Sequence, residues 1–255
     1  MSVSFQDVSF AHRGHPPVLD RFDLTVGDGE VVSIVGRSGA GKTTILKLVN
    51  RLLLPSQGVV SVDGRDTRAW DPIRLRRHTG YVFQDVGLFP HMTVDENVRI
   101  VPRLEGWTSE RAQARSVELL EMVGLPPAAF ADRRPSELSG GQRQRVGLAR
   151  ALAAGPGVLL MDEPFGALDP ITRAEVRAEF ARLQARLGTT VILVTHDMGE
   201  AFSLADRVAV LDAGQMILCD TPRVVATSSD PRVQAFLTAI TPWHGVADRP
   251  DAGPS

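Results

Sequence analysis

The chain has 255 residues, of which 43% are hydrophobic and 23% charged, so it can bury a substantial core. Its formal net charge of −2 argues against bulk attraction to nucleic acid, and its single cysteine, Cys219, excludes an internal disulfide or a multi-cysteine metal site. The N-terminus lacks a signal-peptide pattern, and no apolar run approaches the ~20 residues of a membrane span. We therefore expect any role at a membrane to depend on a partner.

The predicted elements alternate in a way that indicates an α/β fold. In chain order we expect strands up to residue 35, a glycine-rich segment, an apolar helix over 45–53, and strands over 59–62 and 80–83. Residues from about 90 to 155 have a helical pattern interrupted by proline and glycine, which predicts an inserted helical lobe. Strands at 158–161, 191–195 and 208–211 then alternate with helices, the longest over 171–187 and ending at Gly188. The alternation predicts a largely parallel sheet with helices on both faces, and residues 241–255 are expected to be a loose tail.

A phosphate-binding loop is predicted where the strand at 31–35 meets the apolar helix. The sequence matches G-x-x-x-x-G-K-[ST] over Gly36, Arg37, Ser38, Gly39, Ala40, Gly41, Lys42 and Thr43, with Thr44 following. Glycines let the backbone wrap phosphates, the lysine reaches the outer phosphates, and the Thr43 hydroxyl ligates Mg²⁺. Of the 28 basic residues only Lys42 and Lys47 are lysines, which suggests that position 42 needs a compact charge. The alternative is an ordinary glycine-rich turn.

Two acidic residues, Asp162 and Glu163, end the predicted strand at 158–161. Ligands bind at the carboxyl ends of strands in sheets of this kind, so both carboxylates are candidates for a site there. We expect Asp162 to hold the metal through water and Glu163 to orient or deprotonate an attacking water. The alternative is that the pair merely begins a helix.

The segment Leu138-Ser139-Gly140-Gly141-Gln142 predicts a second anion-binding site. Ser139 and Gln142 have the spacing of a capping box, so Ser139 is expected to begin a helix. Gly140 and Gly141 leave the first N–H groups of that helix accessible to an anion. A plain helix cap is the alternative, but it does not account for the two glycines.

These motifs occur in the order found in ATPase subunits of ABC transporters, which residues 2–240 resemble. The resemblance is carried by GRSGAGKTT, Gln84 in YVFQD, LSGGQ, VLLMDEP, Ala167-Leu168-Asp169 and His196. It implies a P-loop NTPase of ABC-ATPase type over residues 1–240. Such a domain has a mostly parallel core sheet, an antiparallel β subdomain, and a helical subdomain inserted at about 90–155.

The resemblance also implies roles for individual residues. Subunits of this family dimerise head to tail, and each ATP lies between the phosphate loop of one copy and the LSGGQ segment of the other. Gln84 would contact Mg²⁺ and report to the membrane subunit, and His196 would touch the γ-phosphate. Asp169 would link the two sites across the dimer. The alternative for His196 is a structural histidine at a strand end.

The segments DEPFGALDPITR and GYVFQDVGLFPHMTVDENV resemble ATPase subunits of bacterial importers for osmoprotectants such as glycine betaine, choline or carnitine. The resemblance implies membrane permease subunits as partners and a peripheral position on the cytoplasmic face of the inner membrane. Aromatic residues are only 5% of the chain, so we expect a separate binding protein or the permease to hold a quaternary amine. Leu88, Phe89 and Met92 are candidates for contact with the permease, or else they pack inside the helical lobe.

Other functions remain open at this stage. The chain is too short after the ATPase core for the regulatory repeats of many osmoprotectant ATPases, which puts direct osmosensing in doubt. An importer for a polyamine, an inorganic anion or ferric iron is the nearest alternative. More distant are an ATPase acting on DNA or ribosomes, disfavoured because there are no sustained heptads and only one cassette, and a lipid-trafficking ATPase.

His12 is the candidate adenine contact. Related ATPases often place an aromatic residue, typically tyrosine, at this position, and an imidazole is also flat enough to stack on a base. The alternative is that His12 is only a loop residue and that the base rests on apolar neighbours. His12 and His15 do not make a convincing metal site, because no further ligand lies nearby in sequence.

Overall fold

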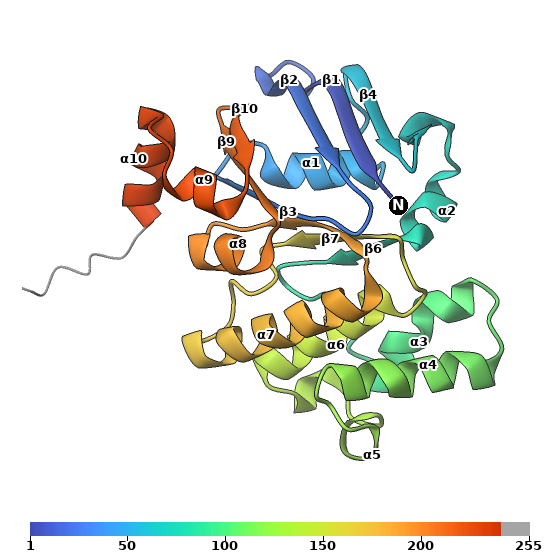
Figure 1. The fold of residues 1–255 in the computed structure, drawn as a ribbon. Coiled ribbons are helices and arrows are strands. Elements are labelled where there is room, and N and C mark those ends of the chain that lie inside the picture. Colours follow the sequence, from blue (N-terminus) through green and yellow to red (C-terminus); the bar gives the residue numbers. More distant parts are fainter. Residues whose placement is uncertain (241–255) are drawn as a thin grey trace, which may run out of the picture.

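A six-stranded sheet forms the centre of the protein, in the order β10-β9-β3-β8-β7-β6 (Figure 1). The structure is a computed structural model and describes residues 1–240. Neighbouring strands are parallel except for the antiparallel pair β9 and β10. The strands are β3 (Val31–Gly36), β6 (Thr79–Val82), β7 (Val158–Asp162), β8 (Thr190–Val194), β9 (Arg207–Asp212) and β10 (Gln215–Asp220). The predicted, mostly parallel core sheet is confirmed.

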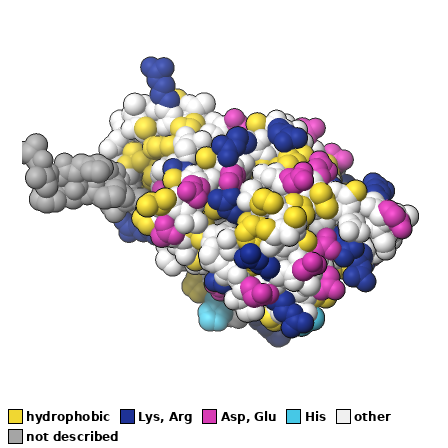
Figure 2. All heavy atoms as spheres, turned by 90° about the horizontal axis from the view of Figure 1, so that it is seen from below, with side chains coloured by type: hydrophobic (Ala, Val, Ile, Leu, Met, Phe, Trp, Pro, Cys, Tyr) yellow, Lys and Arg dark blue, Asp and Glu magenta, His cyan; other side chains and the backbone are white. Residues whose placement is uncertain are grey.

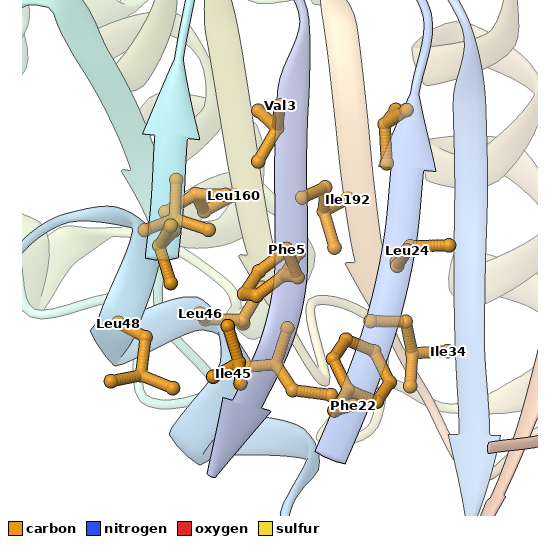
Figure 3. Close-up of a cluster of buried hydrophobic side chains, with 14 of the residues drawn as sticks. Val3, Phe5, Phe22, Leu24, Ile34, Ile45, Leu46, Leu48, Leu160 and Ile192 are labelled. Atoms are coloured by element: carbon orange, nitrogen blue, oxygen red, sulfur yellow. The ribbon is translucent and has the colours of Figure 1, made fainter. Parts of the chain in front are cut away.

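A smaller antiparallel sheet lies above the central one in Figure 1, in the order β2-β1-β4-β5. Its strands are β1 (Val3–Ala11), β2 (Pro17–Val26), β4 (Gln57–Val62) and β5 (Arg65–Asp66). Helix α1 (Lys42–Val49) lies between the two sheets, and Phe5 and Phe22 point toward it with their rings edge to face, 5.2 Å apart (Figure 3). The apolar face of α1, with Ile45 and Leu46 fully buried, therefore joins both sheets in one core.

Helices cover the other face of the central sheet and form a lobe beside it (Figure 1). Four of them lie between β6 and β7 in the chain: α3 (Val94–Leu104), α4 (Ser109–Met122), α5 (Pro127–Phe130) and α6 (Gly140–Leu152). Outside this lobe are α7 (Pro170–Leu187), α8 (Met198–Leu204), α9 (Pro222–Ala226) and α10 (Pro231–Ile240), whereas α2 (Pro72–His78) lies beside β4 and packs into the core shared by the two sheets. Residues 241–255, the predicted tail, lie outside the described residues.

The predicted end of the longest helix is confirmed by its local geometry, whereas the apolar helix expected over 45–53 ends at Val49. Helix α7 buries Val176, Phe180 and Leu183, and it ends at Gly188, which has a left-handed φ of 60°. Only glycine adopts that conformation without steric cost, so the glycine fixes the end of the helix. The strand predicted at 80–83 is one residue shorter at its end, because Phe83 leaves the sheet and is 46% exposed.

The surface of the helical side carries both signs of charge. Seen from below the view of Figure 1, basic, acidic and apolar side chains are interspersed (Figure 2). Within residues 1–240 no helix is both long and apolar enough to cross a membrane.

Candidate nucleotide site

The ends of four parallel strands bring the segments with predicted functional residues to one edge of the central sheet. Strand β8 pairs with both β3 and β7, so that Val194 lies opposite Ile34 on one side and Asp162 on the other. Strand β6 pairs with β7 in turn, with Val82 opposite Met161. The phosphate loop, His196, the Asp162–Glu163 pair and Gln84 each follow one of these strand ends. The register therefore gathers them along a single edge, where ligands bind in such sheets.

The phosphate loop requires glycine at two positions, for a different physical reason at each. Gly41 has φ 103°, and a side-chain carbon there would lie 2.8 Å from Leu19 Cδ2. Gly36 is closely packed, because an added carbon would lie 2.3 Å from the carbonyl oxygen of Leu211. Lys42 Nζ donates to the carbonyl oxygens of Gly36 and Arg37, at 2.8 and 3.0 Å. The lysine thus closes the loop on itself and holds its charge at the loop's centre.

Burial and nearby carboxylates act on Lys42 in opposite directions. Desolvation lowers the pKa of Lys42, and the negative charges of Glu163 and Asp162 partly offset that effect. The loop therefore places a partly desolvated cation beside two acidic groups, so Lys42 would attract a phosphate chain and a divalent cation would offset the repulsion from the carboxylates.

Asp162 meets the phosphate loop through Thr43, whose hydroxyl donates to its Oδ1 at 3.1 Å. The Tyr81 hydroxyl approaches Oδ2 at 3.5 Å, a contact that sequence reasoning missed because it arises only from the pairing of β6 with β7. Burial raises the pKa of Asp162, and the neighbouring Glu163 charge raises it further. A desolvated carboxylate beside a hydroxyl suits a hard divalent cation. Among the described residues no group of three or more His, Cys, Asp or Glu side chains is placed to hold a metal alone.

Glu163 and His196 form a direct pair, with His196 Nδ1 2.5 Å from Glu163 Oε2. Glu163 has φ 49°, an uncommon conformation for a residue with a side chain, and its N–H donates to Val194 O at 2.9 Å. That backbone bond extends the pairing of β7 with β8 by one residue. The left-handed turn then directs the carboxylate toward the histidine rather than along the strand.

Gln84 and His12 lie at opposite margins of this edge. Gln84 is exposed two residues beyond β6. His12 is exposed too, and its ring stands edge to face on Phe10, 5.0 Å between centroids. A hollow of about 680 Å³ contains His12 and reaches the phosphate loop at Gly39. The remaining lining residues are Arg13, His15, Pro16, Pro17, Val18 and Ala213.

The LSGGQ segment begins α6, as predicted. Ser139 Oγ accepts from Gln142 N at 3.2 Å, and the Gln142 side chain accepts from Ser139 N at 2.9 Å, which completes the capping box. An added carbon on Gly141 would lie 2.3 Å from Thr172 Cγ2, so the segment packs closely on the start of α7. Asp169 caps α7, and its Oδ1 accepts from the amides of Ile171 and Thr172. The sequence led us to expect only a link across the dimer for Asp169, so its role as the cap of α7 is additional.

The far end of α6 holds the loop that follows Gln84, a second feature that the sequence did not reveal. Arg150, which is 9% exposed, donates to the carbonyl oxygens of Val86 and Gly87, both at 2.7 Å. Gly147 lets the loop approach, because an added carbon would lie 2.5 Å from Val86 Cγ1. The helix therefore contacts the start of α7 at its LSGGQ end and the loop after Gln84 at the other.

The fold and this arrangement of motifs are those of an ATP-binding cassette. The ABC transporter family matches residues 19–166, and the chain belongs to this family. A dimeric structure of the ATP-binding cassette MJ0796 in a post-hydrolysis state, bound to ADP and Pi, is 34% identical. It covers 87% of this chain and 99% of its own, with a TM-score of 0.77.

Curated relatives include ATP-binding proteins of several import systems. The glycine betaine/carnitine/choline transport protein OpuCA of Bacillus subtilis is 45% identical over 92% of this chain, and the carnitine transport protein OpuCA of Listeria monocytogenes is 48% identical over 92%. The methionine import protein MetN of Leifsonia xyli is 45% identical over 96%. The chain spans 62% and 59% of the length of the two OpuCA proteins and 74% of that of MetN.

Proposed function

We propose that this chain is the ATP-hydrolysing subunit of a bacterial ABC importer. The observation that carries the proposal is the single sheet edge on which the phosphate loop, the Thr43–Asp162 contact and the Glu163–His196 pair meet. ATP would lie with its phosphates in the loop of residues 36–44 and its base over His12. Mg²⁺, held by Thr43, Asp162 and Gln84, would neutralise charge on the phosphates.

Different residues of the chain have different roles in hydrolysis. Lys42 places its ammonium at the outer phosphates, and Glu163 orients and deprotonates the attacking water. His196 holds the γ-phosphate on one side and the Glu163 carboxylate on the other, so both groups stay aligned. Phosphoryl transfer depends mainly on positioning and charge stabilisation, which suits a site assembled from rigid strand ends.

We propose further that two copies bind ATP head to tail. Ser139, Gly140, Gly141 and Gln142 lie at the start of α6, where Ser139 and Gly140 are exposed. A two-fold dimer brings each such helix start to the phosphates held by the other copy. The dimeric MJ0796 cassette supports this arrangement.

The permease would dock on a pocket of about 320 Å³ between α3 and the end of β6. Phe83, Phe89 and Leu104 line it and are 46%, 39% and 56% exposed, which is unusual for large apolar side chains. Leu88, in contrast, packs partly into the helical core. The proposal therefore assigns permease contact to Phe89 rather than Leu88, and places the subunit peripherally on the cytoplasmic face of the inner membrane.

The proposed cargo is an osmoprotectant or other quaternary amine, held by a separate substrate-binding protein. The OpuCA relatives support this cargo, and the low aromatic content argues against a quaternary-ammonium cage on this chain. Methionine is the second candidate, supported by the MetN relative.

Two assays test the proposal. The purified chain should hydrolyse MgATP and should not bind glycine betaine in a calorimetric titration. A strain lacking the gene should lose uptake of labelled glycine betaine, choline or carnitine, and regain it from the wild-type gene but not from Glu163→Gln. If the strain loses only methionine uptake, methionine replaces the quaternary amine as the proposed cargo. If the purified chain does not hydrolyse ATP, the proposed activity is refuted.

A further inference from the structure

One arginine, Arg173 in the first turn of α7, connects two loops that belong to different strand ends. Its Nη2 donates to the carbonyl oxygen of Leu168 at 2.9 Å, and its Nη1 lies 3.4 Å from Asp197 Oδ2. Leu168 stands next to Asp169 in the loop after β7, and Asp197 follows His196 in the loop after β8. A guanidinium has donors in a fixed planar arrangement, so one side chain sets the spacing between the two loops.

Besides the contact of His196 with Glu163, the loop that carries the histidine is held by the residues on both sides of it. The His196 side chain is 67% exposed. Thr195 Oγ1 donates to Glu200 Oε2 at 2.5 Å and accepts from the Asp197 amide at 3.0 Å. Glu200 is only 2% exposed, and its own amide donates to Asp197 Oδ1 at 3.1 Å. The backbone on both sides of His196 is therefore fixed, with Asp197 as the point where Arg173 attaches.

The other end of the connection reaches the LSGGQ segment. Asp169 caps α7 through the amides of Ile171 and Thr172, and Thr172 is the residue against which Gly141 packs. The first turn of α7 thus touches three segments: the LSGGQ turn, the Asp169 loop and, through Arg173, the His196 loop.

We propose that Arg173 is a positioning residue that couples the two ATP sites of the dimer, an inference that rests on the proposed function. In a head-to-tail dimer the Gly141 and Asp169 segments face the ATP of the partner, whereas His196 faces the ATP of its own chain. Arg173 connects the segments that face the partner's ATP with the loop that carries His196. Closure of the dimer around the partner's ATP therefore fixes His196 at the ATP of its own chain.

The ion pair of Arg173 with Asp197 is partly exposed, which favours a role in positioning the loops over a role in stabilising the fold. The Arg173 and Asp197 side chains are 28% and 32% exposed. Ion pairs of this kind contribute little to the stability of a fold, because solvent screens them and two side chains lose freedom. Loss of Arg173 should therefore disturb the relative placement of the loops much more than the folding equilibrium.

The test is steady-state ATP hydrolysis by the purified full chain carrying Arg173→Gln, with Arg182→Gln as the matched control. Arg182 is an exposed arginine of the same helix. We expect Arg173→Gln to lower kcat about tenfold with KM for ATP within about twofold, because misplaced catalytic groups lose rate rather than ground-state binding. The Hill coefficient for ATP should fall from above 1 in the wild type to 1. The thermal midpoint should match that of Arg182→Gln.

Two further variants identify the route of the effect. Arg173→Lys should restore only part of kcat, because one ammonium cannot span the Leu168 carbonyl and Asp197 together. Asp197→Asn keeps an oxygen that can cap α8 but removes the ion pair, and it should lower kcat as Arg173→Gln does. The double variant Arg173→Gln/Asp197→Asn should show no further loss, because both changes remove one connection.

The outcomes separate this inference from the proposed function. If the wild-type and Arg182→Gln chains are active and Arg173→Gln has the same kcat and Hill coefficient as the wild type, the coupling role is overturned. The ATPase proposal then remains intact. A fall in kcat that tracks a lower thermal midpoint would also overturn it, in favour of a structural role. A wild-type chain without ATP hydrolysis would remove both.

Discussion

His196 Nδ1 and Glu163 Oε2 are 2.5 Å apart, and the glutamate that makes this contact has a left-handed backbone with φ 49°. Such a conformation costs about 1–3 kcal/mol for a residue with a side chain, and it persists only where the surroundings enforce it. Here two contacts accompany it, the bond from Glu163 N to Val194 O on β8 and the contact of the carboxylate with His196. The fold thus keeps Glu163 in an unfavourable backbone conformation in which its carboxylate contacts His196.

We predict that Glu163→Gln abolishes ATP turnover while ATP still binds and holds two chains together. The amide keeps the shape of the side chain but cannot accept a proton from water at neutral pH. Phosphate release measures turnover, and size-exclusion chromatography with ATP measures the dimer. The exposed Glu121 gives the control, Glu121→Gln, which should behave as wild type. Near-normal hydrolysis by Glu163→Gln would remove Glu163 from the role of base.

We predict that Asp162→Asn stabilises the metal-free chain at neutral pH and abolishes its response to MgATP. Burial raises the pKa of the Asp162 carboxyl above its usual 3.8, so the folded state holds the proton to higher pH than the unfolded chain. The free energy of unfolding therefore falls as the pH rises from the usual pKa of the carboxyl through its raised pKa. Each kcal/mol recovered by the neutral amide raises the thermal midpoint by about 2–4 °C.

Thermal unfolding at pH 7, with and without MgATP, checks this expectation. Asp132→Asn, at an exposed position, controls for the general effect of removing a negative charge. A lower midpoint for metal-free Asp162→Asn than for the wild type would contradict the expected sign.

We predict that His12→Ala weakens ATP binding and that His12→Tyr preserves it. Stacking of a base on an aromatic side chain contributes about 1–3 kcal/mol, so the alanine variant should lose affinity by at least about fivefold. A titration with a fluorescent ATP analogue measures the effect, and His78→Ala, at an exposed position on α2, is the control. Unchanged affinity in His12→Ala would leave the adenine resting on other residues.

We predict that Gly141→Ala destabilises the protein and that Thr172→Ser relieves the effect. The added carbon would lie 2.3 Å from Thr172 Cγ2, the methyl that serine lacks. Overpacking of this kind costs about 1–3 kcal/mol. Chemical denaturation measures the free energy of unfolding of each variant.

The adjacent glycine provides the control for that experiment. A carbon added at Gly140 would meet only Leu168 Cδ2, at 3.9 Å, so Gly140→Ala should fold with nearly wild-type stability. Equal losses in the two alanine variants would show that helix propensity, not the contact with Thr172, decides the outcome.

The sequence predicted what depends on local pattern. The end of α7 at Gly188 and the Ser139–Gln142 capping box were correct because each is encoded within a few residues. The Tyr81–Asp162 contact was missed because its partners lie 81 residues apart and meet only when β6 pairs with β7. Arg173 was missed for a different reason: an arginine on an amphipathic helix is usually a solvated residue, and nothing local indicates the carbonyl and the carboxylate that it joins.

Helix α6 has a mechanical consequence. It spans 13 residues, or about 20 Å, and is anchored at one end through Arg150 and Gly147 and at the other through Ser139 and Gly141. A rigid rod of that length converts a tilt of about 3° at one end into a displacement of about 1 Å at the other. Because the helix is contacted at both ends, the position of the loop after Gln84 and that of the LSGGQ turn depend on each other through α6.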